Sequence, residues 1–211
     1  MNYKDWKPIY EEIIKDFGYS KEKDIMAANV QSEVRGSDSL KILKRLQGSS
    51  VEILGPYAEN PSEKIVMIAG ASLSHLDKID IDNSFLVTDL DGDTILQKEK
   101  NKDGLTTLIH AHGDNIDLIK KYSPEFTGHV ISTCQCRPLE NVYNFGGFTD
   151  GDRCVFIADH FKAKKVILNG WDLENPAPKG DKRIKKKKLK WAHKLIRLVD
   201  IPISVKQSKG L

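Results

Sequence analysis

The chain has 211 residues, of which 39% are hydrophobic and 30% charged, a composition typical of one globular domain with a small extension. No apolar run approaches the roughly 20 residues that cross a bilayer, and the first residues lack the apolar core of a signal peptide. The three cysteines form no Cys-x-x-Cys pair, so neither a disulfide scaffold nor a zinc ribbon is indicated, and we expect a cytoplasmic protein.

The formal net charge of +3 originates in one segment. Residues 182–190 carry seven of the 33 Lys and Arg residues and no acid, so 26 basic residues face 30 acidic ones elsewhere. Apolar residues at helical spacing follow this run, which favours a solvated helix face. A nucleic-acid-binding surface would spread its basic groups along one face of the protein, so we expect no nucleic acid as a partner.

Helical periodicity dominates the first part of the chain. Residues 3–17 have the pattern of an amphipathic helix. Ser20 is a suitable N-cap for a second helix through about Asn29, with Ile25 and Met26 facing inward. We therefore expect a helical N-terminal region, packed on a larger core.

Strand-like and helix-like segments alternate through the rest of the chain. The predicted strands are 51–54, 64–69, 84–88, 105–111, 128–133, 165–169 and 201–205. The predicted helices are 94–101, 116–122, 152–161 and 181–199. This alternation predicts an α/β fold of the Rossmann-like kind, with a mostly parallel sheet flanked by helices. We divide the chain into a helical region, 1–48, and an α/β catalytic domain, 49–211.

A glycine and a serine follow the predicted strand 64–69. At Gly70 and Ser72 the chain passes from a strand into a short helix, where backbone N–H groups can meet an anion. Many α/β loops share this pattern and bind nothing, so the motif by itself is weak.

Three aspartates alternate after the strand 84–88. Asp89, Asp91 and Asp93 would project to one side of an extended chain. Clustered carboxylates at a strand end suit magnesium, which is usually held by one or two carboxylates and substrate phosphates. The alternative is a surface turn, because Asp-Gly is common in turns.

Two histidines alternate at the end of the strand 105–111. His110 and His112 are followed by Asp114 and Asn115, either of which can cap the next helix. Zinc and di-metal hydrolases share the His-x-His-x-Asp spacing, but no comparable His cluster supplies further ligands. We favour phosphate contact or electrostatic stabilisation, and buried core histidines remain an alternative.

The segment 144–153 combines two glycines, two aromatics and several acids before a helix. Phe145 and Phe148 could enclose a flat ring, while Asp150 could accept paired N–H donors. The alternative is that Asp152 caps the helix and the phenylalanines belong to the core.

These motifs resemble one known family. The matching segments are Thr88–Asp93, His110–Asn115, Asn144–Arg153, Gly170-x-Asp172 and Lys188–Ala192. In this order they resemble the archaeal type of 6-hydroxymethyl-7,8-dihydropterin pyrophosphokinase, a family distantly similar to thiamine pyrophosphokinases. The resemblance implies an ATP- and magnesium-dependent transfer of diphosphate to the pterin hydroxymethyl group, with release of AMP. Such chemistry depends on positioning and charge neutralisation.

The resemblance and the motifs together give the expected site. We expect a magnesium ion at Asp89, Asp91 and Asp93. The expected catalytic residues are His110, His112 and Asp114. The expected ATP-binding residues are Gly70, Ser72, Asn115 and Gln135, and one or two lysines of 182–190 could reach the triphosphate. The expected pterin-binding residues are Asn144, Phe148, Asp150 and Asp172, with Asp150 or Asp172 at the amino-pyrimidinone edge.

Three other functions stay open at this point. Asp-x-Asp at a strand end also binds metal and diphosphate in nucleotide-sugar-dependent glycosyltransferases. The histidine motif allows a metal-dependent hydrolase, and the basic run allows a non-enzymatic nucleic-acid-binding module. We expect ATP and a reduced pterin as small-molecule partners and no membrane, with a homodimer as an open possibility.

Overall fold

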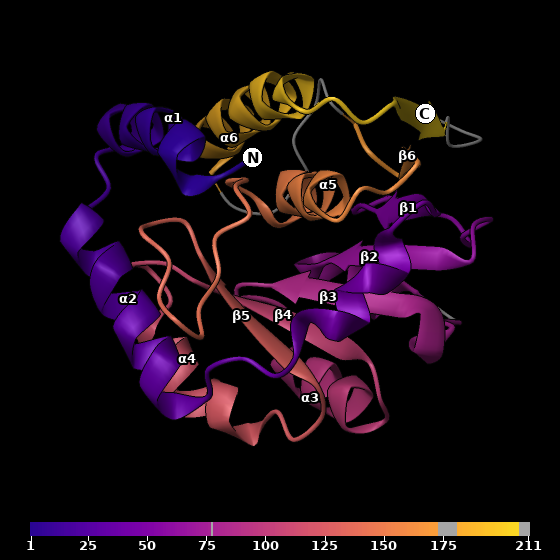
Figure 1. The fold of residues 1–211 in the computed structure, drawn as a ribbon, viewed down its shortest axis with the longest axis horizontal. Coiled ribbons are helices and arrows are strands. Elements are labelled where there is room, and N and C mark those ends of the chain that lie inside the picture. The colour runs from indigo at the N-terminus through magenta and orange to yellow at the C-terminus, as the bar shows by residue number, and fades with distance from the viewer. Residues whose placement is uncertain (77, 173–180, 207–211) are drawn as a thin grey trace.

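The computed structural model describes residues 1–76, 78–172 and 181–206 (Figure 1). In this part of the chain, seven parallel strands form one sheet with the order β5-β4-β3-β2-β1-β6-β7. The strands are β1 (Ser50–Leu54), β2 (Ile65–Ala69), β3 (Ser84–Thr88), β4 (Thr106–Ala111), β5 (Val130–Cys134), β6 (Lys165–Asn169) and β7 (Ile203–Lys206). The predicted α/β fold with a parallel sheet is confirmed.

Helices cover the sheet and one of its edges. They are α1 (Tyr3–Phe17), α2 (Lys21–Val34), α3 (Thr94–Lys102), α4 (Ile116–Tyr122), α5 (Asp150–His160) and α6 (Lys182–Leu195), with short 3-10 helices such as η2 (Gly70–His75). In Figure 1, α5 lies directly on one face of the sheet below α1 and α6, and α3 lies on the other. No helix in the described ranges is long and apolar enough to cross a membrane.

Alternate side chains of the strands fill two cores. On one face, Met67 and Phe85 pack with Val155 and Ile157 of α5. On the other face, β-strand residues such as Leu86 pack with η2 and α3. Because both faces are covered, the central strands β2 and β3 are almost entirely apolar and buried rather than alternating with exposed polar residues.

The strand order reverses once. The chain runs from β1 through β2, β3 and β4 to β5 on one side of the sheet, and then α5 carries it back so that β6 pairs with β1 on the other side. In open parallel sheets, ligands bind beyond the carboxyl ends of the strands at such a reversal.

The second helix corrects one prediction. It continues to Val34, and Ile25 and Met26 are 42% and 56% exposed instead of facing inward. Its buried side chains, at helical spacing, are Asp24, Ala27, Ala28 and Gln31. The helix packs closely on α4 and the β4–β5 edge through small residues, and its two buried polar side chains bond to β5 or to the residue after it. The prediction failed because it assumed an apolar inner face.

The N-terminal helices share their apolar clusters with the rest of the chain. Trp6 and Tyr10 of α1 pack with Phe156 of α5 and Leu195 of α6. Ala27 of α2 packs with residues of β4, β5 and α4. The division into 1–48 and 49–211 stays a prediction.

Candidate active site

Two adjoining cavities lie at the carboxyl end of the sheet. The larger has a volume of about 270 Å³ and the smaller about 180 Å³. Both are lined by Asp91, Thr149, Asp150 and Lys188, so these four residues mark the boundary where the two cavities meet.

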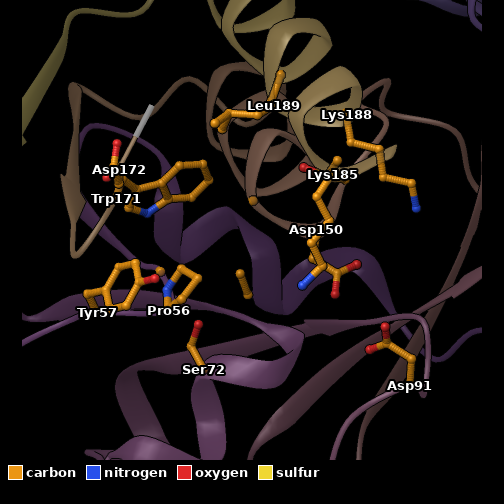
Figure 2. Close-up of a pocket in the computed structure, with 15 residues that line it drawn as sticks. Pro56, Tyr57, Ser72, Asp91, Asp150, Trp171, Asp172, Lys185, Lys188 and Leu189 are labelled. Atoms are coloured by element: carbon orange, nitrogen blue, oxygen red, sulfur yellow. The ribbon is translucent and has the colours of Figure 1, made fainter. Parts of the chain in front are cut away.

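The larger cavity lies at the reversal of strand order. Pro56 and Tyr57 follow β1, Trp171 and Asp172 follow β6, and Leu189 comes from α6. Ser72 of η2 also lines it, as Figure 2 shows. In that view Trp171 and Asp172 lie at one end and Asp91 at the other.

The indole of Trp171 is fixed by backbone on several sides. Its Nε1 donates a hydrogen bond of 3.1 Å to the carbonyl oxygen of Ile53 in β1. A Cβ atom at Gly151 would collide with the ring, and one at Gly55 would lie 2.8 Å from it. The two glycines therefore let the backbone approach the indole closely, and the cavity has a rigid aromatic wall.

The smaller cavity is polar. Its walls include Asp89 and Asp91 after β3, His110 and His112 of the β4 end, and Gln135 after β5. The remaining lining residues include Tyr19, Asp114, Phe148 and Arg153. The structure thus brings the aspartate and histidine motifs together, because the strands that precede them are neighbours.

Asp89 and Asp91 form a close carboxylate pair. The backbone N–H of Asp91 donates to Oδ1 of Asp89 at 3.3 Å. Burial and the charge of Asp89 raise the pKa of Asp91 to about 6. Burial also opposes ionisation of Asp89, but hydrogen bonds from His112 and Asp91 outweigh it and hold the pKa of Asp89 well below its usual range. The two carboxylates therefore repel each other, and Asp91 holds a proton more readily than an isolated aspartate.

Asp93 lies apart from this pair. Its Oδ1 accepts a hydrogen bond of 3.1 Å from the N–H of Leu96, so it caps α3, and it lines neither cavity. The chain does not stay extended after β3, because Leu90 adopts a left-handed conformation with φ of 69°. The three alternating aspartates consequently do not project to one side.

The two histidines lie side by side with different surroundings. Their ring centroids are 5.9 Å apart, and Nε2 of His112 is 3.4 Å from Oδ2 of Asp89. His110 is fully buried, and burial together with the charge of Arg153 holds its pKa well below the usual value, so it is neutral. Its Nδ1 lies 3.1 Å from the hydroxyl of Thr133.

The other ring nitrogen of His110 points to a missing partner. Nε2 is buried and has no hydrogen bond of good geometry within the described part of the chain. Gln135 is near enough to influence the pKa of His110, although it makes no such bond. A buried polar atom without a partner beside a cavity is the place where a ligand atom is expected.

Asn115 ties the ends of β3 and β4 together. Its Nδ2 donates to the carbonyl oxygens of Asp89 at 2.8 Å and of His110 at 2.7 Å, and its Oδ1 accepts from the N–H of His112. It occupies the N-cap position of α4 without a side-chain cap bond and lines neither cavity. Asn115 therefore fixes the distance between the two motifs.

The first turn of α5 begins at Asp150, two residues before the predicted start. Thr149 is the N-cap, and Asp152 accepts from the N–H groups of Phe148 at 2.6 Å and Thr149 at 2.9 Å in a capping box. Asp150 instead faces the cavities, and burial together with the charges of nearby carboxylates raises its pKa well above the usual value. A Cβ atom at Gly70 would collide with the Asp150 carboxylate, so Gly70 gives Asp150 its space.

The two phenylalanines of the loop before α5 separate. Phe145 packs in the core against His160 and Phe161, so the predicted sandwich of a flat ring between Phe145 and Phe148 is wrong. Phe148 lines the smaller cavity, with its ring centroid 5.1 Å from that of Phe17. Asn144 braces the loop by donating to the carbonyl oxygen of Cys136, and it lines neither cavity.

Several lining residues were not among the predicted site residues, including Tyr19, Arg153 and Trp171, and the basic run was predicted without singling out Lys188. Arg153 and Trp171 stand inside the quoted motifs, so their types were visible, but their direction depends on contacts across the sheet. Arg153 is buried, and its guanidinium donates to the carbonyl oxygens of Gly147 and Phe148. Only the packing of α6 shows which lysine of the basic run reaches both cavities.

The donor set fits a magnesium ion better than zinc. Within the described residues, no three His, Cys, Asp or Glu side chains are placed to hold a metal by themselves. Magnesium commonly uses one or two carboxylates and completes its coordination with water and phosphate oxygens. Asp89 and Asp91, which repel each other, are the two carboxylates that could hold such an ion.

Comparison with known proteins gives a consistent result. Residues 49–177 match the family model described as "6-hydroxymethylpterin diphosphokinase MptE-like". The chain is 36% identical to a protein of Methanocaldococcus jannaschii named 6-hydroxymethyl-7,8-dihydropterin pyrophosphokinase, over 97% of this chain and 98% of that protein. Proteins of the same name from Pyrococcus furiosus and Methanothermobacter thermautotrophicus are 35% and 31% identical, covering 93% and 82% of this chain and 93% and 79% of their own.

Proposed function

Because the chain belongs to the 6-hydroxymethylpterin diphosphokinase MptE-like family, we propose that it transfers diphosphate from ATP to the hydroxymethyl group of 6-hydroxymethyl-7,8-dihydropterin. The hydroxymethyl oxygen attacks the β-phosphorus, the bond from that phosphorus to the α–β bridging oxygen breaks, and AMP leaves. The observation that carries the proposal is the pair of adjoining cavities, one with an aromatic wall and one with carboxylates and histidines.

The larger cavity suits the pterin. Its volume of about 270 Å³ accommodates a bicyclic ring, and the fixed indole of Trp171 offers a flat surface for stacking. Asp172, beside Trp171 and far from Asp91, is the better placed of the two expected carboxylates for the amino-pyrimidinone edge (Figure 2). The hydroxymethyl group would then point towards Asp150.

Asp150 is suited to the role of general base. It lies where the two cavities meet, and its raised pKa brings it closer to the pH at which a proton is taken up efficiently. It would accept the hydroxyl proton as the new P–O bond forms.

The smaller cavity suits the phosphates and magnesium. Asp89 and Asp91 would hold the ion, which when bound neutralises charge on the phosphates. The unpaired Nε2 of His110 would donate to a phosphate oxygen, with Lys188 adding positive potential. These groups would stabilise the charge that develops as the bridging bond breaks.

The test is to incubate the purified protein with ATP, magnesium and the reduced pterin and to follow AMP and pterin diphosphate. Equal amounts of the two products, absent without pterin, are the expected result. ATP hydrolysis that does not depend on pterin, or transfer from a nucleotide sugar alone, would contradict the proposal.

A matched pair of variants tests the placement of the pterin. Trp171→Leu should weaken pterin binding about tenfold or more and leave ATP binding nearly unchanged, since stacking on an aromatic contributes about 1–3 kcal/mol. Trp191→Leu is the control, because Trp191 bonds to Asp16 on α1 and lines neither cavity. Loss of ATP binding with retained pterin binding in Trp171→Leu would show that the two ligands are exchanged.

A further inference from the structure

A buried carboxylate in the N-terminal region contacts the active site from outside. Asp24 of α2 is only 2% exposed and lies on the inward face of that helix. Asp is rarely buried unless its charge is compensated by hydrogen bonds or a partner. The groups that donate hydrogen bonds to Asp24 therefore indicate its structural role.

Three donors from three segments converge on Asp24. Its Oδ2 accepts from the hydroxyl of Tyr10 in α1 and from Nε2 of Gln135 after β5, each at 2.8 Å. Its Oδ1 accepts from the backbone N–H of Gly113 after β4 at 2.7 Å. The carboxylate thus joins the N-terminal helices to two strand ends.

Two of these donors belong to the polar cavity. Gln135 lines it, and because Asp24 holds the amide nitrogen, the amide oxygen is the group left to face the cavity and His110. Gly113 stands between His112 and Asp114, which also line the cavity. A Cβ atom at Gly113 would lie 2.6 Å from Cβ of Lys23, so this loop is in direct contact with α2.

We propose that Asp24 is a positioning residue for the diphosphate transfer: it sets the orientation of the Gln135 amide and fixes the loop that carries His112 and Asp114. The proposal rests on the proposed function, since the Gln135 amide and the loop with His112 line the cavity that would hold the phosphates. It assigns the N-terminal helices, which lie outside the matched range 49–177, a part in the reaction.

The same helix offers a matched control. Gln31 is two turns further along the inward face, fully buried, and its Nε2 donates to the hydroxyl of Ser132 in β5 at 2.7 Å. Ser132 lines neither cavity. Gln31 therefore makes a comparable buried hydrogen bond from the same helix, to β5 itself, without reaching the site.

Asp24→Asn is the main test. The asparagine side chain has the same shape, but one carboxylate oxygen, an acceptor, becomes an NH₂ donor. The Gln135 amide must then exchange the positions of its oxygen and nitrogen or lose its hydrogen bond to residue 24. We expect kcat to fall about 10- to 100-fold, as for other residues that orient catalytic groups, while KM for the pterin changes less than about twofold. Gln31→Leu should lower the melting temperature and leave kcat nearly unchanged. Equal kcat in the two variants would overturn the proposal.

A double-mutant cycle shows whether Asp24 acts through Gln135. If it does, Asp24→Asn should lower kcat much less when Gln135→Leu is already present. Effects that simply multiply would contradict the orientation part of the proposal. Should Asp24→Asn not fold, Asp24→Glu keeps the charge and both acceptors but moves them by one methylene, and the same fall in kcat is expected.

A binding measurement separates this proposal from the proposed function. Calorimetry with magnesium and a non-hydrolysable ATP analogue needs no pterin and no turnover. Weaker binding by about tenfold in Asp24→Asn, with normal binding in Gln31→Leu, supports the positioning role even if the wild-type protein releases no AMP from ATP and pterin. Unchanged binding and unchanged kcat in Asp24→Asn would overturn it.

Discussion

The segment after β3 and the first turn of α5 share a sequence pattern, in which aspartates alternate where a helix begins. In both segments the aspartates have two different structural roles. The last aspartate of each pattern, Asp93 or Asp152, accepts backbone N–H groups and caps the helix. The earlier ones, Asp89, Asp91 and Asp150, line the cavities.

The difference lies in the hydrogen-bond donors. Capping aspartates receive N–H groups that would otherwise be unpaired, so they stabilise the fold. Asp150 accepts no hydrogen bond from the described residues. The pKa of Asp91 is raised by burial and by the neighbouring charge of Asp89. Carboxylates that repel each other are candidates for ligand binding, and the spacing alone does not distinguish them from capping aspartates.

The largest difference in activity should appear between variants of Asp91 and variants of Asp93. Asp91→Asn should reduce AMP release about 10³-fold with an unchanged circular dichroism spectrum, because the variant lacks one of the two proposed magnesium ligands. Near-normal activity at saturating magnesium would rule out Asp91 as a ligand.

The second-largest loss of activity is expected for a variant of Asp150. Asp150→Asn should lower kcat about 10²-fold, as expected for loss of a general base. Its melting temperature should be equal to or above that of the wild type, since a repelling carboxylate is removed. A clear loss of stability would mean that Asp150 is structural, like Asp152.

Asp152→Ala should lose stability more than activity, the opposite of Asp150→Asn. It leaves buried N–H groups of Phe148 and Thr149 unpaired, so the free energy of unfolding should fall by about 2–4 kcal/mol. Denaturant unfolding measures this, and the folded fraction should retain more activity than Asp150→Asn. Stability close to that of the wild type would contradict the capping role.

The raised pKa of Asp91 predicts a dependence on pH. As the pH falls through about 6, the Asp89–Asp91 pair takes up a proton that magnesium must displace, so magnesium affinity should fall up to about tenfold per pH unit below 6. Without metal, the same pair should destabilise the fold increasingly as the pH rises from about 4 to 6. In Asp91→Asn both dependences should be largely removed, as magnesium titration and thermal unfolding would show.

The smallest effect is expected for Asp93→Ala. Loss of one exposed cap of α3 should cost about 1 kcal/mol of unfolding free energy and change kcat less than about twofold. A loss of activity comparable to that of Asp91→Asn would restore Asp93 as a third ligand.

The sequence allowed the fold to be predicted well, because strand and helix periodicities are local. Asp89 and His110 lie close together because they stand at the ends of the neighbouring parallel strands β3 and β4, and Asp150 reaches the same cavity from the first turn of α5. The failures are long-range. The outward position of Ile25 depends on what α2 packs against, and the core position of Phe145 depends on α5 and the residues that follow it.

Trp171 and Asp24 illustrate the same limit within the site. Their types were visible in the sequence, but nothing local shows that a carbonyl of β1 holds the indole or that two strand ends donate to one carboxylate. Such roles arise only from tertiary contacts.

The pairing of β1 with β6 has a consequence for synthesis of the protein. The indole that forms the aromatic wall bonds to a residue 118 positions earlier in the chain. During translation the β1 half of the larger cavity leaves the ribosome many seconds before its other half, at about 5–20 residues per second. A nascent chain can therefore align β1 to β5 before the larger cavity has its aromatic wall.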